Sequence, residues 1–345
     1  MCSSDLLVRS YLHHFFIRDA TTKAYEPYIS DTYLRYNFAE TKIVNGLGEP
    51  EQWYSLLPPD RYQALKDRID LDFAHTNQKF FAAGEPVSLD LFVKNIDSLI
   101  VRVFEINTHN YYREHLREVN TDINLDGLVA NDDETVEYDE SPLRRVRRHF
   151  EFPALTKAGV YVVDFIGNGI NSRLVVRKGQ LRHLVRTTPA GQVFTIFNEN
   201  NNLVKDASIQ LAGHEYQPDE DGQVLVPFST QPARQPIIIS RGDFSSLAFF
   251  PHQAENYQLA AGIYVDRESL LKRAQAPVVI RSGLYLNGTP VGLSGLEDVR
   301  LTISSVDNEG VSSSKEIKDF ELFEDRRSEE RRVGKECRSR WSPYH

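Results

Sequence analysis

Alternation of apolar and polar residues is the feature that most restricts how this chain can fold. In the segment VSLDLFV, the side chains of Val87, Leu89, Leu91 and Val93 fall on one face of an extended strand. Two further segments, LIVRVFEI (99–106) and VYVVDFI (160–166), are rich in the β-branched and aromatic residues that strands favour. Shorter strand-like segments follow, separated by clusters of Gly, Pro, Asn and Asp. The pattern predicts an all-β fold of tandem antiparallel β-sandwiches.

The spacing of these strands divides the chain into successive units. We expect a first sandwich at 70–182 with an insertion at 107–141, and a second sandwich at 183–276. Residues 277–326 hold only three or four predicted strands, which is few for a sandwich. We therefore expect them to form a truncated third β domain.

The segment 1–69 differs from the rest of the chain. The residues PPDRYQALKDRI predict a helix, because Tyr62, Leu65 and Ile69 are spaced i, i+3, i+7 and Asp60 lies in the first turn. The remainder of 1–57 is aromatic-rich and irregular. We expect a short, mixed, partly helical segment, which could be the end of an upstream domain.

Composition restricts the classes of partner. The net charge is −9, so nucleic acid is not an expected partner. No apolar run is long enough to span a bilayer. The two cysteines, Cys2 and Cys337, do not form a disulfide framework.

The last nineteen residues, 327–345, have no apolar periodicity. Written back into codons, RSEERRVGKECRSRWSPYH resembles a short-read sequencing adapter in one continuous frame. We expect this tail to be adapter-derived and exclude it from the prediction of the fold, as a cloning scar would be excluded.

The stretch NTDINLDGLVANDDE (120–134) contains D-x-N-x-D-G, the opening of a calcium-binding loop. With Asp122 at position 1, the ligand positions 3, 5 and 12 fall on Asn124, Asp126 and Asp133. The alternative is an acidic, solvated insertion with an Asx-rich turn. Because Asp at position 12 has a short side chain, we expect any calcium bound by these four residues to be weak and structural. No other cofactor is predicted.

Three further motifs have ordinary structural explanations. Arg144–Arg148 (RRVRR) contains a proprotein-cleavage pattern, but a basic strand edge that neutralises nearby acids explains it equally well. The R-G-D of Ser240–Phe244 and the sequon of Asn287–Thr289 both fit turns. Neither a G-x-S-x-G elbow, an H-E-x-x-H pair nor a P-loop occurs, so nothing in the sequence supports an enzyme.

Several segments resemble alpha-macroglobulins of the bacterial type. The segment Asn77–Asn107 resembles the opening of a macroglobulin-type sandwich through Phe81, Gly84, Glu85 and Val87, although Ala83 replaces the usual proline. The segments Phe150–Phe165 and Leu203–Phe228 resemble the closing strands and the next module. The resemblance implies macroglobulin-like or fibronectin III-like sandwiches in a fragment from the N-terminal side of a multi-domain protein.

The resemblance also implies a function. We expect a non-catalytic scaffold segment of a protease-trapping or protein-binding protein, with protein partners that could include proteases, and an extracellular or periplasmic location. The C-G-E-Q-type thioester motif of the family does not occur in this chain. The alternative is a calcium-stabilised adhesion or binding module built from the same sandwiches.

Overall fold

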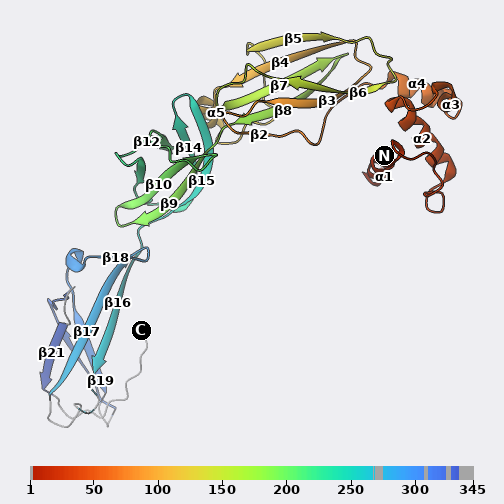
Figure 1. The fold of residues 1–345 in the computed structure, drawn as a ribbon. Coiled ribbons are helices and arrows are strands. Elements are labelled where there is room, and N and C mark those ends of the chain that lie inside the picture. The colour runs from red at the N-terminus through yellow and green to blue at the C-terminus, as the bar shows by residue number, and fades with distance from the viewer. Residues whose placement is uncertain (1–2, 267, 269–274, 307–309, 324–327, 334–345) are drawn as a thin grey trace. The chain divides into compact units, whose positions relative to one another are not determined.

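The computed structural model of the chain describes residues 3–266, 268, 275–306, 310–323 and 328–333 (Figure 1). Four helices come first and are followed by strands, with one further short helix, α5, between the strands. The prediction of an all-β chain after a short helical segment is therefore confirmed. Within the described residues, the model contains no helix that combines the length and the apolar character needed to cross a membrane.

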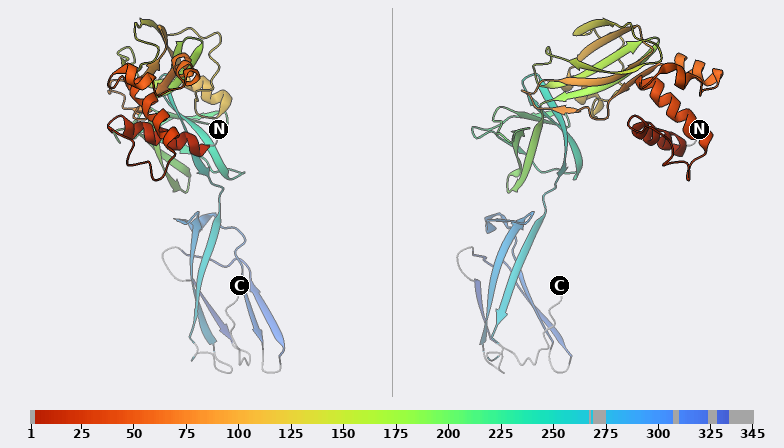
Figure 2. Two further views of the ribbon diagram at one scale, coloured as in Figure 1. Left: turned by 90° about the vertical axis from the view of Figure 1, so that its right-hand side faces the viewer. Right: turned by 45° about the vertical axis from the view of Figure 1, so that its right-hand side comes forward.

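Residues 3–67 form what we call the helical head, the helices coloured red to orange in Figure 2. Its helices are α1 (Ser3–Phe16), α2 (Asp31–Asn45), α3 (Pro50–Tyr54) and α4 (Pro59–Asp67). The predicted helix at 58–69 is α4, which ends earlier because Arg68 is extended. The other three helices were not predicted.

The head has an apolar centre of its own. Leu12 and Phe16 of α1 pack against Leu34 and Phe38 of α2, and the rings of Phe16 and Phe38 meet edge to face with centroids 5.1 Å apart. Helix α2 ends where Gly46 adopts a left-handed conformation, with φ of 61°, which glycine tolerates without a steric penalty.

The first sandwich consists of two sheets. One sheet has the order β1-β3-β6, and the other has the order β2-β8-β7-β4-β5. Neighbouring strands in both sheets are antiparallel, except that β2 runs parallel to β8. The strands are β1 (Asp70–Phe73), β2 (Phe80–Phe81), β3 (Ser88–Lys94), β4 (Ser98–Ile106), β5 (Asp132–Glu137), β6 (Arg145–Glu151), β7 (Gly159–Gly167) and β8 (Ile170–Lys178).

The core of the first sandwich contains the residues that alternation predicted. Leu89 and Leu91 on β3 are fully buried, and Val101 and Val103 on β4 are nearly so. All four belong to one cluster with Phe165 of β7. The predicted register of these two strands is therefore correct.

The predicted insertion at 107–141 is only partly an insertion. It contains helix α5 (Thr108–His115), whose first turn is capped by the side chain of Asn107. Its second half, however, forms β5, which pairs with β4 along its whole length. Residues 132–137 are therefore an edge strand of the five-stranded sheet and not a solvated loop.

The second sandwich ends earlier than predicted. Its sheets have the orders β13-β10-β9 and β12-β11-β14-β15. The strands are β9 (Leu181–Thr188), β10 (Gly191–Asn198), β11 (Ser208–Leu211), β12 (His214–Tyr216), β13 (Gln223–Val226), β14 (Ala233–Arg241) and β15 (Phe244–His252). The next strand, β16 (Tyr257–Val265), pairs with β17 (Gln275–Leu286) of the following domain, so the boundary expected at 276 lies nearer His252.

The third domain has two sheets, one built on β17 and one formed by β19 and β20. Its remaining described elements are β18 (Thr289–Val291), the 3-10 helix η2 (Leu293–Gly295), β19 (Leu301–Val306), β20 (Ser312–Ile317) and β21 (Ser328–Val333). The strand β21 lies in the tail that we expect to be adapter-derived, and it pairs with β17. Residues 327 and 334–345 of that tail lie outside the described residues.

Replacing Leu91 with alanine should destabilise the first sandwich by about 2–5 kcal/mol, because the side chain is fully buried. Hydrogen exchange of the amides in β3, β4 and β7 measures this change locally. Leu184→Ala is the control, because Leu184 is 66% exposed. A cost below about 0.5 kcal/mol for Leu91→Ala would contradict its place in the core.

Candidate functional site

The four predicted calcium ligands do not come from one loop. Asp122 and Asp126 lie on an exposed turn, where the side-chain oxygen of Asn124 accepts a hydrogen bond from the backbone N–H of Asp126 at 2.9 Å. Asp133 lies on β5 instead, and its carboxylate pairs with Arg102 at 3.0 Å. Among the described residues, no group of three or more His, Cys, Asp or Glu side chains is placed to hold a metal.

The residues between the acids are anchored in the protein. Leu125 is buried, and Ile123 packs beside it, in what we call the outer cluster. The outer cluster lies outside the core of the first sandwich and consists of Phe104, Ile106, Tyr112, Val119, Leu125, Val160, Val162, Val175 and Ile238. Arg173 also donates a hydrogen bond to the carbonyl of Ile123 at 3.2 Å. The alternation of Ile123 and Leu125 with the acids is the sequence signal for this packing, and it was missed.

The basic segment Arg144–Arg148 forms the start of the edge strand β6, and most of its charges are paired. Arg145 pairs with Asp70 and Asp72 of β1, and Arg147 pairs with Asp90 of β3. The hydrogen bonds from Arg147 and His149 to its carboxylate lower the pKa of Asp90, against the opposing effect of burial. The arginines of β6 therefore pair mainly with aspartates on β1 and β3, the other strands of the same sheet. In the predicted insertion, Glu140 is the partner of Arg148.

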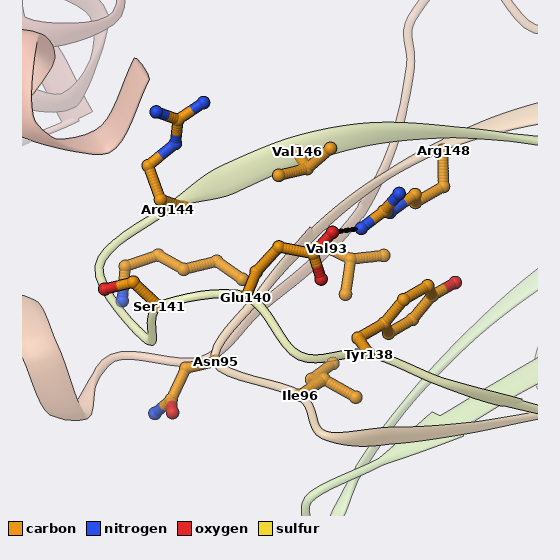
Figure 3. Close-up of a pocket in the computed structure, with 10 residues that line it drawn as sticks. Val93, Asn95, Ile96, Tyr138, Glu140, Ser141, Arg144, Val146 and Arg148 are labelled. Carbon is orange, nitrogen blue, oxygen red and sulfur yellow. Dashed lines mark hydrogen bonds and ion pairs between the residues drawn. The ribbon is translucent and has the colours of Figure 1, made fainter. Parts of the chain in front are cut away.

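Figure 3 shows the end of this strand that lies nearest the helical head. The guanidinium of Arg148 pairs with Glu140 and lies 4.5 Å from the ring centroid of Tyr138. Arg144 points away from that pair. Its guanidinium lies against Gly46 at the end of α2, so closely that a side chain at position 46 would collide with it. A cation at this place is favourable because helix C-termini carry partial negative charge.

A buried lysine connects the head to the first sandwich. Lys94, at the end of β3, is 1% exposed. Its ammonium donates to the carbonyls of Leu65 and Arg68 at the end of α4, each at 2.6 Å. Burial lowers the pKa of Lys94 to about 8; nearby Asp70 opposes this shift and nearby Arg68 adds to it. Lys94 therefore provides hydrogen bonds that fix α4 on the sandwich.

The head also has an apolar surface. Leu7, Tyr11 and Phe15 of α1 are 58%, 59% and 46% exposed, and Val8 beside them is 41% exposed. We call these four residues the outer face of α1. The helix thus has apolar residues on both sides, since Leu12 and Phe16 are buried in the head.

Three segments of the chain match family models. Residues 2–69 match the model described as the actin-binding protein F N-terminal domain. Residues 99–179 and 266–331 match the first and third immunoglobulin-like domains of AbpF. The chain is also 37% identical over 334 residues to actin-binding protein F of Dictyostelium discoideum, which covers 94% of this chain and 14% of that protein. The chain therefore spans about one seventh of the length of this relative.

Two solved structures have weaker similarity. A structure of alpha-2-macroglobulin from Escherichia coli spanning domains MG0-NIE-MG1 has a TM-score of 0.35 and 13% identity, and covers 53% of this chain and 64% of that one. A chimeric titin Z1Z2 tandem has a TM-score of 0.27 and 10% identity, and covers 54% of this chain and all of the other.

The comparisons correct the predicted family. The resemblance to alpha-macroglobulin is wrong, because the family models and the relative point to actin-binding protein F with immunoglobulin-like domains. The expectations that depended on it are wrong as well: a scaffold segment of a macroglobulin-like, protease-inhibiting protein, protease partners, and an extracellular or periplasmic location. The residues Gly84, Glu85 and Val87 lead into β3 and are compatible with a β-sandwich of either family.

Calcium binding by 120–134 remains a prediction. Because Asp133 is paired with Arg102, we expect calorimetric titration of the whole chain to show no calcium affinity tighter than about 0.1 mM. The double variant Asp122→Ala, Asp126→Ala should abolish whatever weak binding is found. Micromolar affinity that disappears in this variant would contradict the expectation.

The lowered pKa of Lys94 predicts a pH dependence of stability. An unfolded lysine has a pKa of about 10.4, so between about pH 8 and 10 the unfolded chain binds more protons than the folded chain. The contribution of Lys94 to the free energy of unfolding should therefore rise with pH in this window. Lys94→Met should remove that part of the slope.

The slope is measured by hydrogen exchange of α4 and β3 amides, with the exchange rates corrected for pH. Lys66→Met is the control for losing a lysine beside this contact, because Lys66 lies exposed on α4. Identical slopes for the unchanged protein and Lys94→Met would contradict a depressed pKa at this position.

Proposed function

We propose that this chain is an actin-binding segment of a longer protein that carries immunoglobulin-like domains, and that it acts by binding and not by catalysis. The observation that carries the proposal is the 37% identity to actin-binding protein F over 334 residues, together with the match of the head to the N-terminal domain of that protein. A protein partner and a location at the actin cytoskeleton follow from the same proposal.

The outer face of α1 is the surface that we propose to contact actin. Leu7, Tyr11 and Phe15 are spaced i, i+4, i+8, so they lie along one side of the helix. A row of exposed apolar residues on one helix is unusual on a soluble surface and is typical of interaction sites. Such a helix can lie in an apolar groove of a partner, and tyrosine is among the residues that contribute most to binding free energy.

The proposal predicts that the chain sediments with filamentous actin and that the triple variant Leu7→Ser, Tyr11→Ser, Phe15→Ser does so at least about tenfold more weakly, which corresponds to about 1.4 kcal/mol. Because the contact is apolar, the affinity of the unchanged chain should change little when the salt concentration is raised. Co-sedimentation over a series of actin concentrations measures both effects.

The matched control is Leu184→Ser with Leu225→Ser, which removes exposed leucines from the second sandwich. Circular dichroism verifies that both variants keep the fold. Failure of the unchanged chain to sediment with actin would contradict the proposed function. Equal binding by the triple variant and the control would instead contradict α1 as the contact surface.

A further inference from the structure

The face of the β14–β15 hairpin that points away from the core of the second sandwich is buried. On β14, Ile237 and Ile239 are fully buried, and Ile238 between them points the opposite way because successive strand residues alternate in direction. Ile238 is nevertheless only 3% exposed, and Ser245 on β15 only 1%. Both side chains must therefore be covered from outside.

The cover is helix α5 and the loop that follows it, which belong to the first sandwich. Ile238 is a member of the outer cluster, together with Tyr112 of α5 and Leu125 of the loop. Leu247 of β15 packs against the same cluster. The acidic stretch of the sequence thus carries apolar side chains that extend from the first sandwich to the second.

Hydrogen bonds beside this apolar contact also join the start of α5 to the β14–β15 hairpin. The backbone N–H of Ser245 donates to the hydroxyl of Thr108 at 3.2 Å. The hydroxyl of Ser240 lies 3.3 Å from Nδ1 of His109 and 2.8 Å from the hydroxyl of Ser245. The polar atoms at the edge of the contact are therefore paired, as a stable buried contact requires.

A second group of hydrogen bonds joins the two sandwiches near their linker. The carboxylate of Glu199 accepts hydrogen bonds from the backbone N–H groups of Ala83 at 2.9 Å and Gln180 at 3.2 Å. Burial opposes the charge of this carboxylate, yet these bonds leave the pKa of Glu199 below its ordinary value. The linker between β8 and β9 is only Gly179–Gln180, and Gly179 has a φ of 75°.

We infer that α5 and its loop, residues 107–131, act as a clamp that holds β11, β14 and the start of β15 on the first sandwich in one orientation. A short linker alone limits the distance between two domains but leaves their orientation free. The clamp adds an apolar contact and paired hydrogen bonds, which fix the orientation. In agreement, α5, its loop and these strands lie in one compact unit, which consists of Met1–His183, Ile196–Glu215 and Pro236–Ala248. This inference does not depend on actin binding.

The test is a distance measurement between two spin labels by pulsed electron paramagnetic resonance on the full chain. The labels are attached to cysteines introduced at Glu134 and His214, which are exposed on the first and second sandwiches, with Cys2 and Cys337 replaced by serine. We expect one narrow distance distribution. The variant Ile238→Ser, Leu247→Ser should lose the narrow peak and give a broad distribution while keeping its strand content.

The matched control is Phe249→Ser, on the same strand as Leu247 but 45% exposed, which should keep the narrow peak. A broad distribution in the protein without clamp substitutions would overturn the inference, and so would a narrow one in a folded clamp variant. If Ile238→Ser, Leu247→Ser loses its strand content, Thr108→Ala with His109→Ala takes its place, because it removes only hydrogen bonds. That variant should broaden the distance distribution, and a narrow peak unchanged from that of the unsubstituted protein would overturn the inference.

Discussion

The structure depends on strand β7 being buried on both faces. Tyr161, Val163 and Phe165 point into the core of the first sandwich, and Val160 and Val162 point into the outer cluster. A strand buried on both sides requires a second layer, because exposed apolar side chains on the outer face would be unfavourable in water. Helix α5 and its loop provide that layer. The same layer then meets β14, so the burial of one strand also determines the contact between two domains.

Because the two faces of β7 are buried, the polar groups enclosed with them must be paired. Asp164, in the middle of β7, is 4% exposed and pairs with Arg173 at 3.1 Å. The hydroxyl of Tyr112 in the outer cluster donates to Glu118 at 3.0 Å, and burial, followed by the charge of Glu118, raises its pKa. The ammonium of the buried Lys94, at the end of β3, donates to the backbone carbonyls of Leu65 and Arg68. Each group is stabilised by a partner from a neighbouring element, so the polar pairs connect elements that the apolar cores alone would leave less firmly oriented.

The sequence was sufficient to predict the core residues of the first sandwich, but not the helices of the head or the packing of the loop after α5. Leu89, Leu91, Val101 and Val103 could be predicted because each strand has one clearly apolar face. Helix α1 could not be predicted in this way, because apolar residues lie on both of its sides and obscure the helical period. The packing of the loop could not be predicted from the calcium motif, because the acids of the motif are exposed, whereas the buried Leu125 between them determines where the loop packs. The uninterrupted apolar run of β7 was an available signal for a second layer, because strands buried on both faces do not alternate.

The incorrect assignment to the alpha-macroglobulins also has a physical explanation. Residues that open a β-sandwich strand, such as Gly84 and Val87, are selected by turn geometry and burial, which many sandwich families share. They indicate the architecture and not the partner. The helical head is different, because a sandwich does not require it, and its segment matches the model described as the N-terminal domain of actin-binding protein F. The residues of its outer face stay about half exposed, whereas Leu12 and Phe16 are buried in the head. A surface that stability does not explain is where a function carried by binding has to be sought, and this is why the proposed contact is placed on α1 and not on the sandwich.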